Sequence, residues 1–160
     1  MIKIRKTKTN EWKNIKDKVN EIEKNTFEKE LQYEDIDFET FKNKKAINLL
    51  LFNDDRVVGY LMSSRLEDDI RCNKDVHYGK FDTYYLESIA IIPKYQGKGL
   101  GKKLFSKFLG LVKQKGCRRV LLDAASDSME KLALFYSFKK IRHHKNWEGS
   151  RSAWFMERIL

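Results

Sequence analysis

A glycine-rich segment near the middle of the chain has the residue types that bind phosphate. Gly97, Gly99 and Gly101 follow a run of strand-forming residues and precede a long segment with an apolar stripe. A strand, a glycine-rich turn and a helix together present free backbone N–H groups and the positive end of a helix dipole at one point. We therefore expect residues 96–102 to hold a phosphate-bearing ligand.

Two common phosphate-binding signatures do not fit this segment. The dinucleotide fingerprint G-x-G-x-x-G, started at Gly97, requires a glycine where the chain has Lys102. The P-loop requires four residues between its glycines, whereas Gly97 and Gly101 are separated by three. The remaining alternatives are another phosphate-binding loop or an ordinary strand-to-helix turn in a lysine-rich surface.

Glu87 is a carboxylate in the middle of an otherwise apolar strand. Its neighbours include Leu86, Ile89 and Ile91. A carboxylate in such surroundings is costly unless it is paired or used in chemistry. Glu87 is therefore either a candidate catalytic group or one half of a structural ion pair, for which Arg65 is a plausible partner across a hairpin.

The elements that position these residues alternate between strands and helices along the chain. The strand at 83–92 is apolar on both faces apart from Glu87 and Ser88, which places it at the centre of a sheet. Residues 26–45 are predicted to form a loop plus a short helix, and residues 66–80 a surface loop that joins strands. Periodicity and turn residues predict strands at 2–6, 119–123, 139–144 and 152–159, a hairpin at 46–65, and helices at 12–22, 100–115 and 128–137.

Composition restricts the class of protein. The chain has 160 residues, which predicts a single domain over 1–160. Its N-terminus alternates like a strand and no run approaches the ~20 apolar residues of a membrane span, so we expect a cytoplasmic protein. The formal charge of +10 favours polyanionic partners without choosing among them.

The sequence gives no indication of a metal site. Cys72 and Cys117 are far apart and are interpreted as free thiols. The adjacent His143 and His144 would point to opposite faces of a strand. No metal cofactor is expected.

One further pattern fits the glycine segment. Gln96, Gly99 and Gly101 form Q-x-x-G-x-G after a central strand and before a long helix, which resembles the acetyl-CoA loop of the GNAT N-acetyltransferase superfamily. The order of elements is similar over nearly the whole chain. The resemblance implies an α/β (α+β) fold, with a mixed, mostly antiparallel sheet of about six or seven strands flanked by helices on both faces.

The resemblance also implies where acetyl-CoA binds. Its pantetheine arm would pair with the backbone of Ile89, Ala90 and Ile91, in a slot opened by a splay from strand 119–123, commonly through a β-bulge. Its pyrophosphate would be clasped by the backbone amides of Gln96, Gly97, Lys98, Gly99, Leu100, Gly101 and Lys102.

Two residues acquire catalytic roles through the same resemblance. An alkyl ammonium, with a pKa of about 10.4, must lose a proton before it attacks, and Glu87 matches the family's glutamate base. Residues 134–141 resemble the family's L-Y-x-x-x-G-F, with Lys140 and Ile141 in place of Gly and Phe. This match implies that Tyr136 is the acid that protonates the coenzyme A thiolate. The alternative is that Tyr136 is a half-buried core tyrosine. Met129 then stands at the family's cofactor-contacting asparagine, for which Asp127 or Ser128 could substitute.

The resulting prediction is an acetyl-CoA-dependent N-acetyltransferase acting by direct transfer in a ternary complex. The acceptor is a primary amine, on a protein N-terminus, a lysine, or a small molecule such as a polyamine. It would approach over 26–45, 66–80 and 145–151, and the protein would be a monomer or homodimer. The alternative is a module of the same fold that senses acyl-CoA or binds nucleic acid without catalysis.

Overall fold

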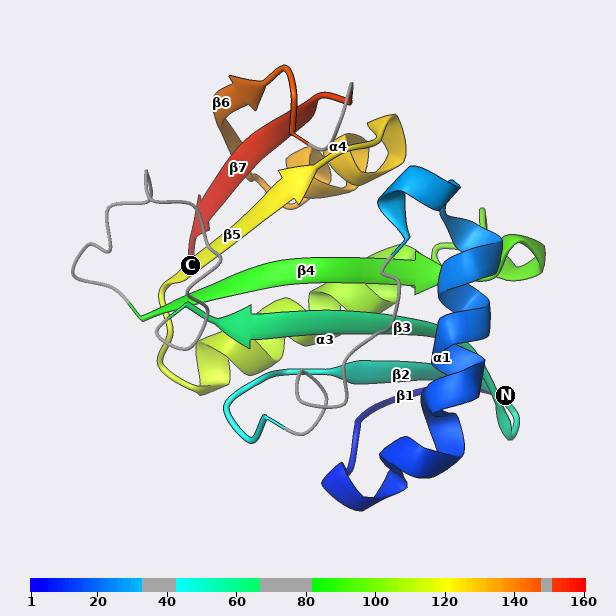
Figure 1. Cartoon of the computed structure of the whole chain (residues 1–160). Coiled ribbons are helices and arrows are strands. Elements are labelled where there is room, and N and C mark those ends of the chain that lie inside the picture. Colours follow the sequence, from blue (N-terminus) through cyan, green and yellow to red (C-terminus); the bar gives the residue numbers. More distant parts are fainter. Residues whose placement is uncertain (33–42, 67–81, 148–150) are drawn as a thin grey trace.

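A seven-stranded sheet forms the centre of the protein (Figure 1). The computed structural model describes residues 1–32, 43–66, 82–147 and 151–160, and the strands below lie in these ranges. The sheet order is β1-β2-β3-β4-β5-β7-β6, and within it only β4 and β5 pair in parallel. The strands are β1 Ile2–Lys6, β2 Leu49–Asn53, β3 Arg56–Arg65, β4 Thr83–Ile91, β5 Arg119–Ala124, β6 Lys139–His144 and β7 Ala153–Ile159.

Helices cover both faces of the sheet (Figure 1). On one face lies α1, Trp12–Thr26, whose buried Val19 and Ile22 pack against Tyr60 and Met62 of β3. The other face carries α3, Leu100–Gln114, and α4, Asp127–Phe135. Short 3-10 turns lie at Thr9–Glu11, Lys29–Leu31 and Pro93–Tyr95.

This architecture confirms the predicted fold class. Each strand and helix predicted within the described ranges is present, with boundaries shifted by a few residues. Most of the predicted loop at 66–80, and half of the one at 26–45, lies outside the described residues. No helix in the described part of the chain is long and apolar enough to cross a membrane.

The core is larger on the α3 face. There Leu104, Phe105 and Phe108 of α3 are fully buried against β2, β3 and β4. The apolar stripe predicted for this helix is therefore the surface that fixes its first turn beside the end of β4. The glycine-rich loop is held between two well-packed elements, which leaves its own backbone free for other contacts.

The pairing of β4 with both of its neighbours is interrupted near Glu87. Against β3, Met62 pairs with Ser88 while the next residue, Ser63, pairs with Leu86, so Glu87 is the extra residue of a β-bulge. Against β5, the paired residues run from Thr83–Arg119 to Leu86–Leu122 and stop there. The last part of β4 consequently separates from β5, as the predicted slot requires.

Candidate active site

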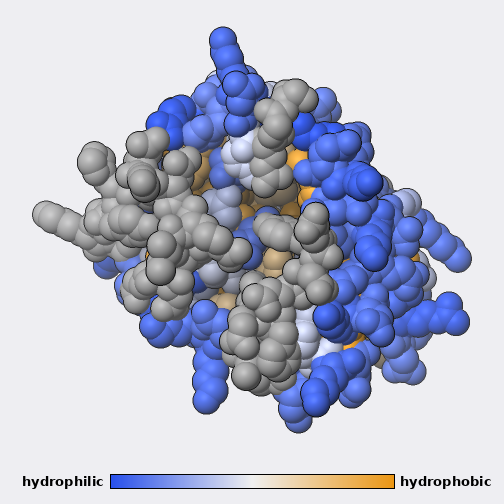
Figure 2. Space-filling view, in the orientation of Figure 1, coloured by the Kyte–Doolittle hydropathy of each residue, from blue (hydrophilic) through white to orange (hydrophobic). Residues whose placement is uncertain are grey.

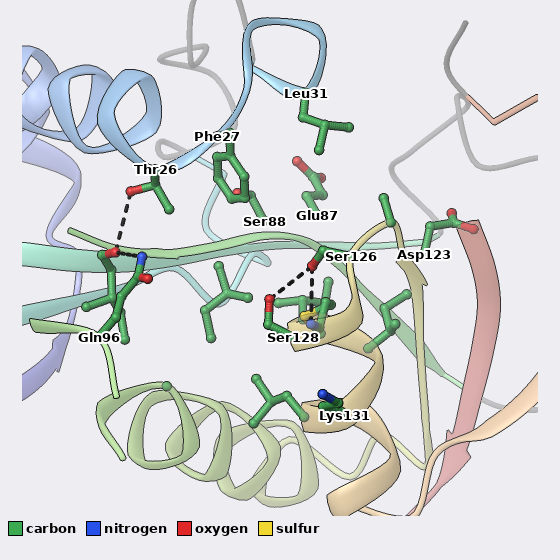
Figure 3. A pocket seen from close by; sticks show the side chains of 18 of the residues that line it. Thr26, Phe27, Leu31, Glu87, Ser88, Gln96, Asp123, Ser126, Ser128 and Lys131 are labelled. Atoms are coloured by element: carbon green, nitrogen blue, oxygen red, sulfur yellow. Dashed lines mark hydrogen bonds between the residues drawn. The ribbon is translucent and has the colours of Figure 1, made fainter. Parts of the chain in front are cut away.

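A cavity of about 810 Å³ opens where β4 and β5 separate (Figure 3). One end is bounded by the glycine-rich loop and the first turn of α3, and the other by the segment that follows α1. In Figure 2 apolar side chains are visible in a hollow on this face, next to hydrophilic residues. We call this space the β4–β5 cavity; it is large enough for an extended organic ligand.

The glycine-rich loop turns its backbone N–H groups outward. Gly97 and Gly99 have φ angles of +74° and +72°, in the left-handed region where a side chain is strained. Within the described residues the N–H groups of 97–102 have no hydrogen-bond acceptor, and the first bond of the helix is from Lys103 N–H to the Gly99 carbonyl. A Cβ atom added at Gly97 or Gly99 would meet nothing within 4 Å. The loop is therefore an open cradle for an anion.

The Gln96 side chain fixes this loop to the end of β4. Its Nε2 donates a hydrogen bond to the Ile91 carbonyl oxygen at 2.7 Å (Figure 3). The Thr26 hydroxyl contacts the same oxygen from α1 at 3.5 Å. Sequence reasoning used only the backbone amide of Gln96 and missed this anchoring role of its side chain.

Beyond the bulge, the peptide groups of successive β4 residues point alternately toward β3 and away from it. Ile92 N–H bonds to the Val58 carbonyl, so in the antiparallel ladder Ala90 and Tyr60 also form a hydrogen-bonded pair. The peptide groups of Ile89 and Ile91 then point away from β3, toward the β4–β5 cavity. Of the three residues expected to pair with a pantetheine arm, these two present their polar backbone to the cavity.

Glu87 lies in the wall of the β4–β5 cavity, on the α1 side of the sheet. The bulge directs Glu87 and Ser88 to the same side, and Figure 3 shows both with Phe27 and Leu31, whereas Lys131 lies on α4 beyond the β4 strand. Glu87 is half-buried, and its Oε1 atom is fully buried. A carboxylate in this position can accept a proton from a ligand that enters from the α1 side.

Asp123 supplies a second carboxylate to the same wall. It is the fifth residue of β5, and its Oδ2 accepts a hydrogen bond from the Tyr85 hydroxyl at 2.6 Å. Burial raises the pKa of Asp123 above its ordinary value, although hydrogen bonds from Tyr85 and Trp147 and the charges of His144 and Arg142 oppose the shift. Sequence reasoning missed Asp123, but a carboxylate at the end of the apolar run 120–122 is the same signal that identified Glu87.

Ion pairs join the two segments expected to border the acceptor. Arg151, after β6, pairs with Glu28 and lies 3.7 Å from a carboxylate oxygen of Glu30. Arg151 and Glu28 both line the β4–β5 cavity. The described ends of 26–45 and 145–151 thus meet at one mouth of the cavity, while 67–81 lies outside the described residues.

Comparison with known proteins is consistent with this geometry. The model of the acetyltransferase (GNAT) family matches residues 12–138, which is most of the chain. The chain belongs to the GNAT acetyltransferase family. Its curated relatives are named N-acetyltransferases.

Two curated relatives and one solved structure of similar fold illustrate how far the similarity extends. N-alpha-acetyltransferase 30 of Schizosaccharomyces pombe is 27% identical over 75 residues, covering 47% of this chain and half of that protein. The [ribosomal protein bS18]-alanine N-acetyltransferase of Haemophilus influenzae is 28% identical over 114 residues, covering 69% of this chain and 68% of that one. The solved structure of yncA from Salmonella typhimurium with its cofactor acetyl-CoA superposes with a TM-score of 0.74 at 18% identity, over all of this chain and 94% of that one.

The end of α4 favours a second alignment of the GNAT tyrosine motif, which we propose here. The glycine of L-Y-x-x-x-G-F follows a helix, and here the residue with the left-handed conformation is Ser137, with φ +62°. Phe138 follows, is buried, and donates its N–H to the Ala133 carbonyl, as in a Schellman cap. Ser137 and Phe138 therefore occupy the glycine and phenylalanine positions, three residues before Lys140 and Ile141.

This shift moves the tyrosine position of the motif from Tyr136 to Ala133, which is fully buried. Tyr136 itself is not among the residues that line the β4–β5 cavity. Its hydroxyl donates to the Lys102 carbonyl at 2.7 Å, and its ring packs against Phe105. The position of Tyr136 fits the alternative, a structural tyrosine.

The same shift moves the cofactor-contacting asparagine from Met129 to Ser126. Ser126 is the N-cap of α4, and its hydroxyl accepts a hydrogen bond from Met129 N–H at 3.2 Å. Ser126 and Ser128 both line the β4–β5 cavity, with their hydroxyls 3.3 Å apart (Figure 3). A pair of serines at a helix N-terminus thus replaces the amide expected there.

Proposed function

We propose that this GNAT protein transfers an acetyl group from acetyl-CoA to a primary amine, directly, in a ternary complex. The observation that carries the proposal is the placement of two features on one cavity. An open row of backbone N–H groups lies at one end of the β4–β5 cavity, and the Glu87 carboxylate lies in its wall. The first feature suits a diphosphate and the second suits a proton-bearing amine.

The described residues fit acetyl-CoA, which supplies the acetyl thioester when bound. The N–H groups of 97–102 would hold its pyrophosphate, and the open space at Gly97 and Gly99 leaves room for it. The peptide groups of Ile89 and the N–H of Ile91 would pair with its pantetheine arm as an added strand would, while the Ile91 carbonyl stays bonded to Gln96. A backbone N–H near Ile89 would stabilise the negative charge that develops on the acetyl oxygen.

The amine would enter from the α1 side, where the carboxylates lie. An alkyl ammonium has a pKa of about 10.4, so at neutral pH it arrives charged and must be deprotonated. Glu87 would accept that proton, and the Asp123 carboxylate in the same wall would face the incoming cation. Two relatives are named for acetylating an alpha-amino group or a ribosomal-protein alanine, which puts protein N-termini first among the acceptors to test, ahead of lysines and polyamines.

An acceptor panel tests the proposal. Purified protein is mixed with acetyl-CoA and peptides with free N-termini, lysine side chains or polyamines, and release of the coenzyme A thiol is followed. The expected result is turnover with at least one amine class, lost on Glu87→Gln. If coenzyme A raises the melting temperature but no amine is acetylated, the protein is a binding module and the enzymatic proposal is wrong.

A further inference from the structure

A chain of hydrogen bonds leads from the β4–β5 cavity into the interior of the protein. It consists of Ser88 on β4, Tyr60 on β3 and Glu23 in the last turns of α1. The Ser88 and Tyr60 hydroxyl oxygens are 3.0 Å apart, and the Tyr60 hydroxyl donates to Glu23 Oε2. Tyr60 is fully buried, Glu23 is 1% exposed, and Ser88 lines the cavity. None of these groups has a role in the transfer described above.

With Glu23 as an ionised carboxylate, the direction of the hydrogen bonds in this chain is fixed. A tyrosine hydroxyl has one hydrogen, and that of Tyr60 is donated to the Glu23 carboxylate. The Tyr60 oxygen must then accept in its contact with Ser88, so the Ser88 hydrogen points inward. Ser88 consequently presents only oxygen lone pairs to the β4–β5 cavity. A hydroxyl oriented in this way accepts a hydrogen bond from a ligand N–H group.

The bulge in β4 brings this acceptor next to the first one. Because Glu87 is the extra residue, Glu87 and Ser88 both face the α1 side (Figure 3). An amine nitrogen in front of β4 therefore meets a carboxylate and an oriented hydroxyl that leads to a second carboxylate. This arrangement corresponds to the stoichiometry of the reaction, since an ammonium nitrogen loses two protons when it becomes an amide.

We propose that Ser88, Tyr60 and Glu23 form the path of the second proton. The inference rests on the proposed N-acetyltransferase function and assigns Glu87 the first proton, which leaves the ammonium before attack. As the N–C bond forms, the remaining excess proton on nitrogen passes to Ser88 Oγ, the Ser88 proton passes to Tyr60, and the Tyr60 proton passes to Glu23. In this scheme Ser88 is the catalytic residue, and Tyr60 and Glu23 are positioning residues that act through it.

The same path returns the proton at the end of the reaction. When the C–S bond breaks, the sulfur takes the bonding electron pair and leaves as a thiolate. The proton held by Glu23 moves back through Tyr60 and Ser88 to that sulfur, which yields the free thiol and restores the carboxylate. The relay thereby supplies the acid that the position of Tyr136 does not supply.

A purely structural role for Glu23 can be separated from a relay role by Glu23→Gln. Glutamine has nearly the same shape, and its carbonyl oxygen can still accept the Tyr60 hydrogen bond. The amide cannot accept a proton, however. A structural network should tolerate this variant, whereas a relay should not. Tyr60→Phe interrupts the chain at its centre, and Ser88→Ala removes its end at the cavity.

The experiment measures kcat, the KM values of both substrates and the pH dependence of kcat for wild type and the three variants. We expect each variant to lower kcat by about 10²-fold with little change in the KM for acetyl-CoA, because proton transfer is affected and cofactor binding is not. In H2O–D2O mixtures, a plot of wild-type kcat against the deuterium fraction should be curved, because several protons move in the same step. In Ser88→Ala the same plot should be linear.

Matched controls are available on the same two strands, β3 and β4. Tyr84→Phe removes a buried hydroxyl that donates to the Lys45 carbonyl, and Ser63→Ala removes one that donates to the Ile47 carbonyl; both lie away from the cavity. These controls should keep wild-type kcat. Unchanged kcat in folded Glu23→Gln or in Ser88→Ala would overturn the relay while leaving the enzyme assignment intact. If wild type itself acetylates no amine, the proposed function fails first.

Discussion

The hydroxyl of Tyr136 donates a hydrogen bond to the main-chain carbonyl of Lys102, 2.7 Å away. This bond ties the end of α4 to the first turn of α3, immediately behind the glycine-rich loop. The Tyr136 ring lies with its centroid 5.1 Å from that of Phe105, which is fully buried. Tyr136, which the sequence motif predicted to be the catalytic acid, therefore joins α4 to α3.

Tyr136→Phe should lower stability and leave catalysis nearly unchanged. One intramolecular hydrogen bond contributes about 1 kcal/mol, so urea unfolding should show a loss of that size. The value of kcat for the best acceptor should stay within about twofold, because general acid catalysis, worth about 10²-fold or more, is not involved. A loss of two orders of magnitude in kcat would restore Tyr136 to the role of acid.

Glu87→Gln should abolish most of the activity without weakening cofactor binding. Loss of a general base lowers kcat/KM by about 10²- to 10⁴-fold, while the backbone groups that would hold acetyl-CoA are unchanged. Thiol release measures the first effect and coenzyme A titration the second. Asp55→Asn, in the exposed β2–β3 turn, is the control and should behave as wild type. Equal loss of cofactor affinity and turnover would indicate a structural role for Glu87.

The cradle and the central strand could be predicted because their signals are local. A strand, three glycines and a helix lie in one stretch of sequence, and the positive φ angles of Gly97 and Gly99 favour glycine. Glu87 was likewise visible as a charge in an apolar strand. These features depend on residues a few positions apart, so periodicity and spacing are sufficient to place them.

The tyrosine and the interior proton path could not be predicted for two different reasons. Ser137 adopts the left-handed conformation that the motif assigns to glycine, and a search for a glycine in the sequence does not detect it. Glu23, Tyr60 and Ser88 come from three elements far apart in the chain, and only the packing of α1 on the sheet brings them together. A β-bulge, which has no signature here, decides that Ser88 faces the cavity.

Gly99→Ala and Gly116→Ala should separate backbone strain from ligand binding. Both glycines have a φ near +72° and open space where a Cβ would lie, one before α3 and one after it. Each variant should lower stability by about 1 kcal/mol, because alanine is strained in that region. Gly99→Ala alone should also weaken coenzyme A binding, since its methyl group would lie in the anion cradle. Equal coenzyme A affinity in the two variants would contradict a ligand at the loop.

Acetyl-CoA should stabilise the folded protein by mass action. At 100 times its dissociation constant, a ligand that binds only the native state adds about 2.7 kcal/mol to the free energy of unfolding. Urea unfolding across a titration measures this gain, and dephosphorylated pantetheine fragments should give much less at equal concentration. A melting temperature that does not change with acetyl-CoA would count against the whole site.

Asp123→Asn should change how stability depends on pH. Burial raises the native pKa of Asp123 above the ordinary value of 3.8, so between these two pKa values the native state binds more protons than the unfolded state. The free energy of unfolding of wild type should therefore fall as pH rises through that window, and asparagine, which has no charge to bury, removes this fall. Between pH 4 and 7, the free energy of unfolding of Asp123→Asn should rise relative to that of wild type as the pH increases. Tyr85→Phe removes a hydrogen bond that lowers the pKa of Asp123, so this variant should extend the pH window upward. A constant difference in the free energy of unfolding between Asp123→Asn and wild type at every pH would show that the pKa of this carboxyl is not perturbed by the cavity.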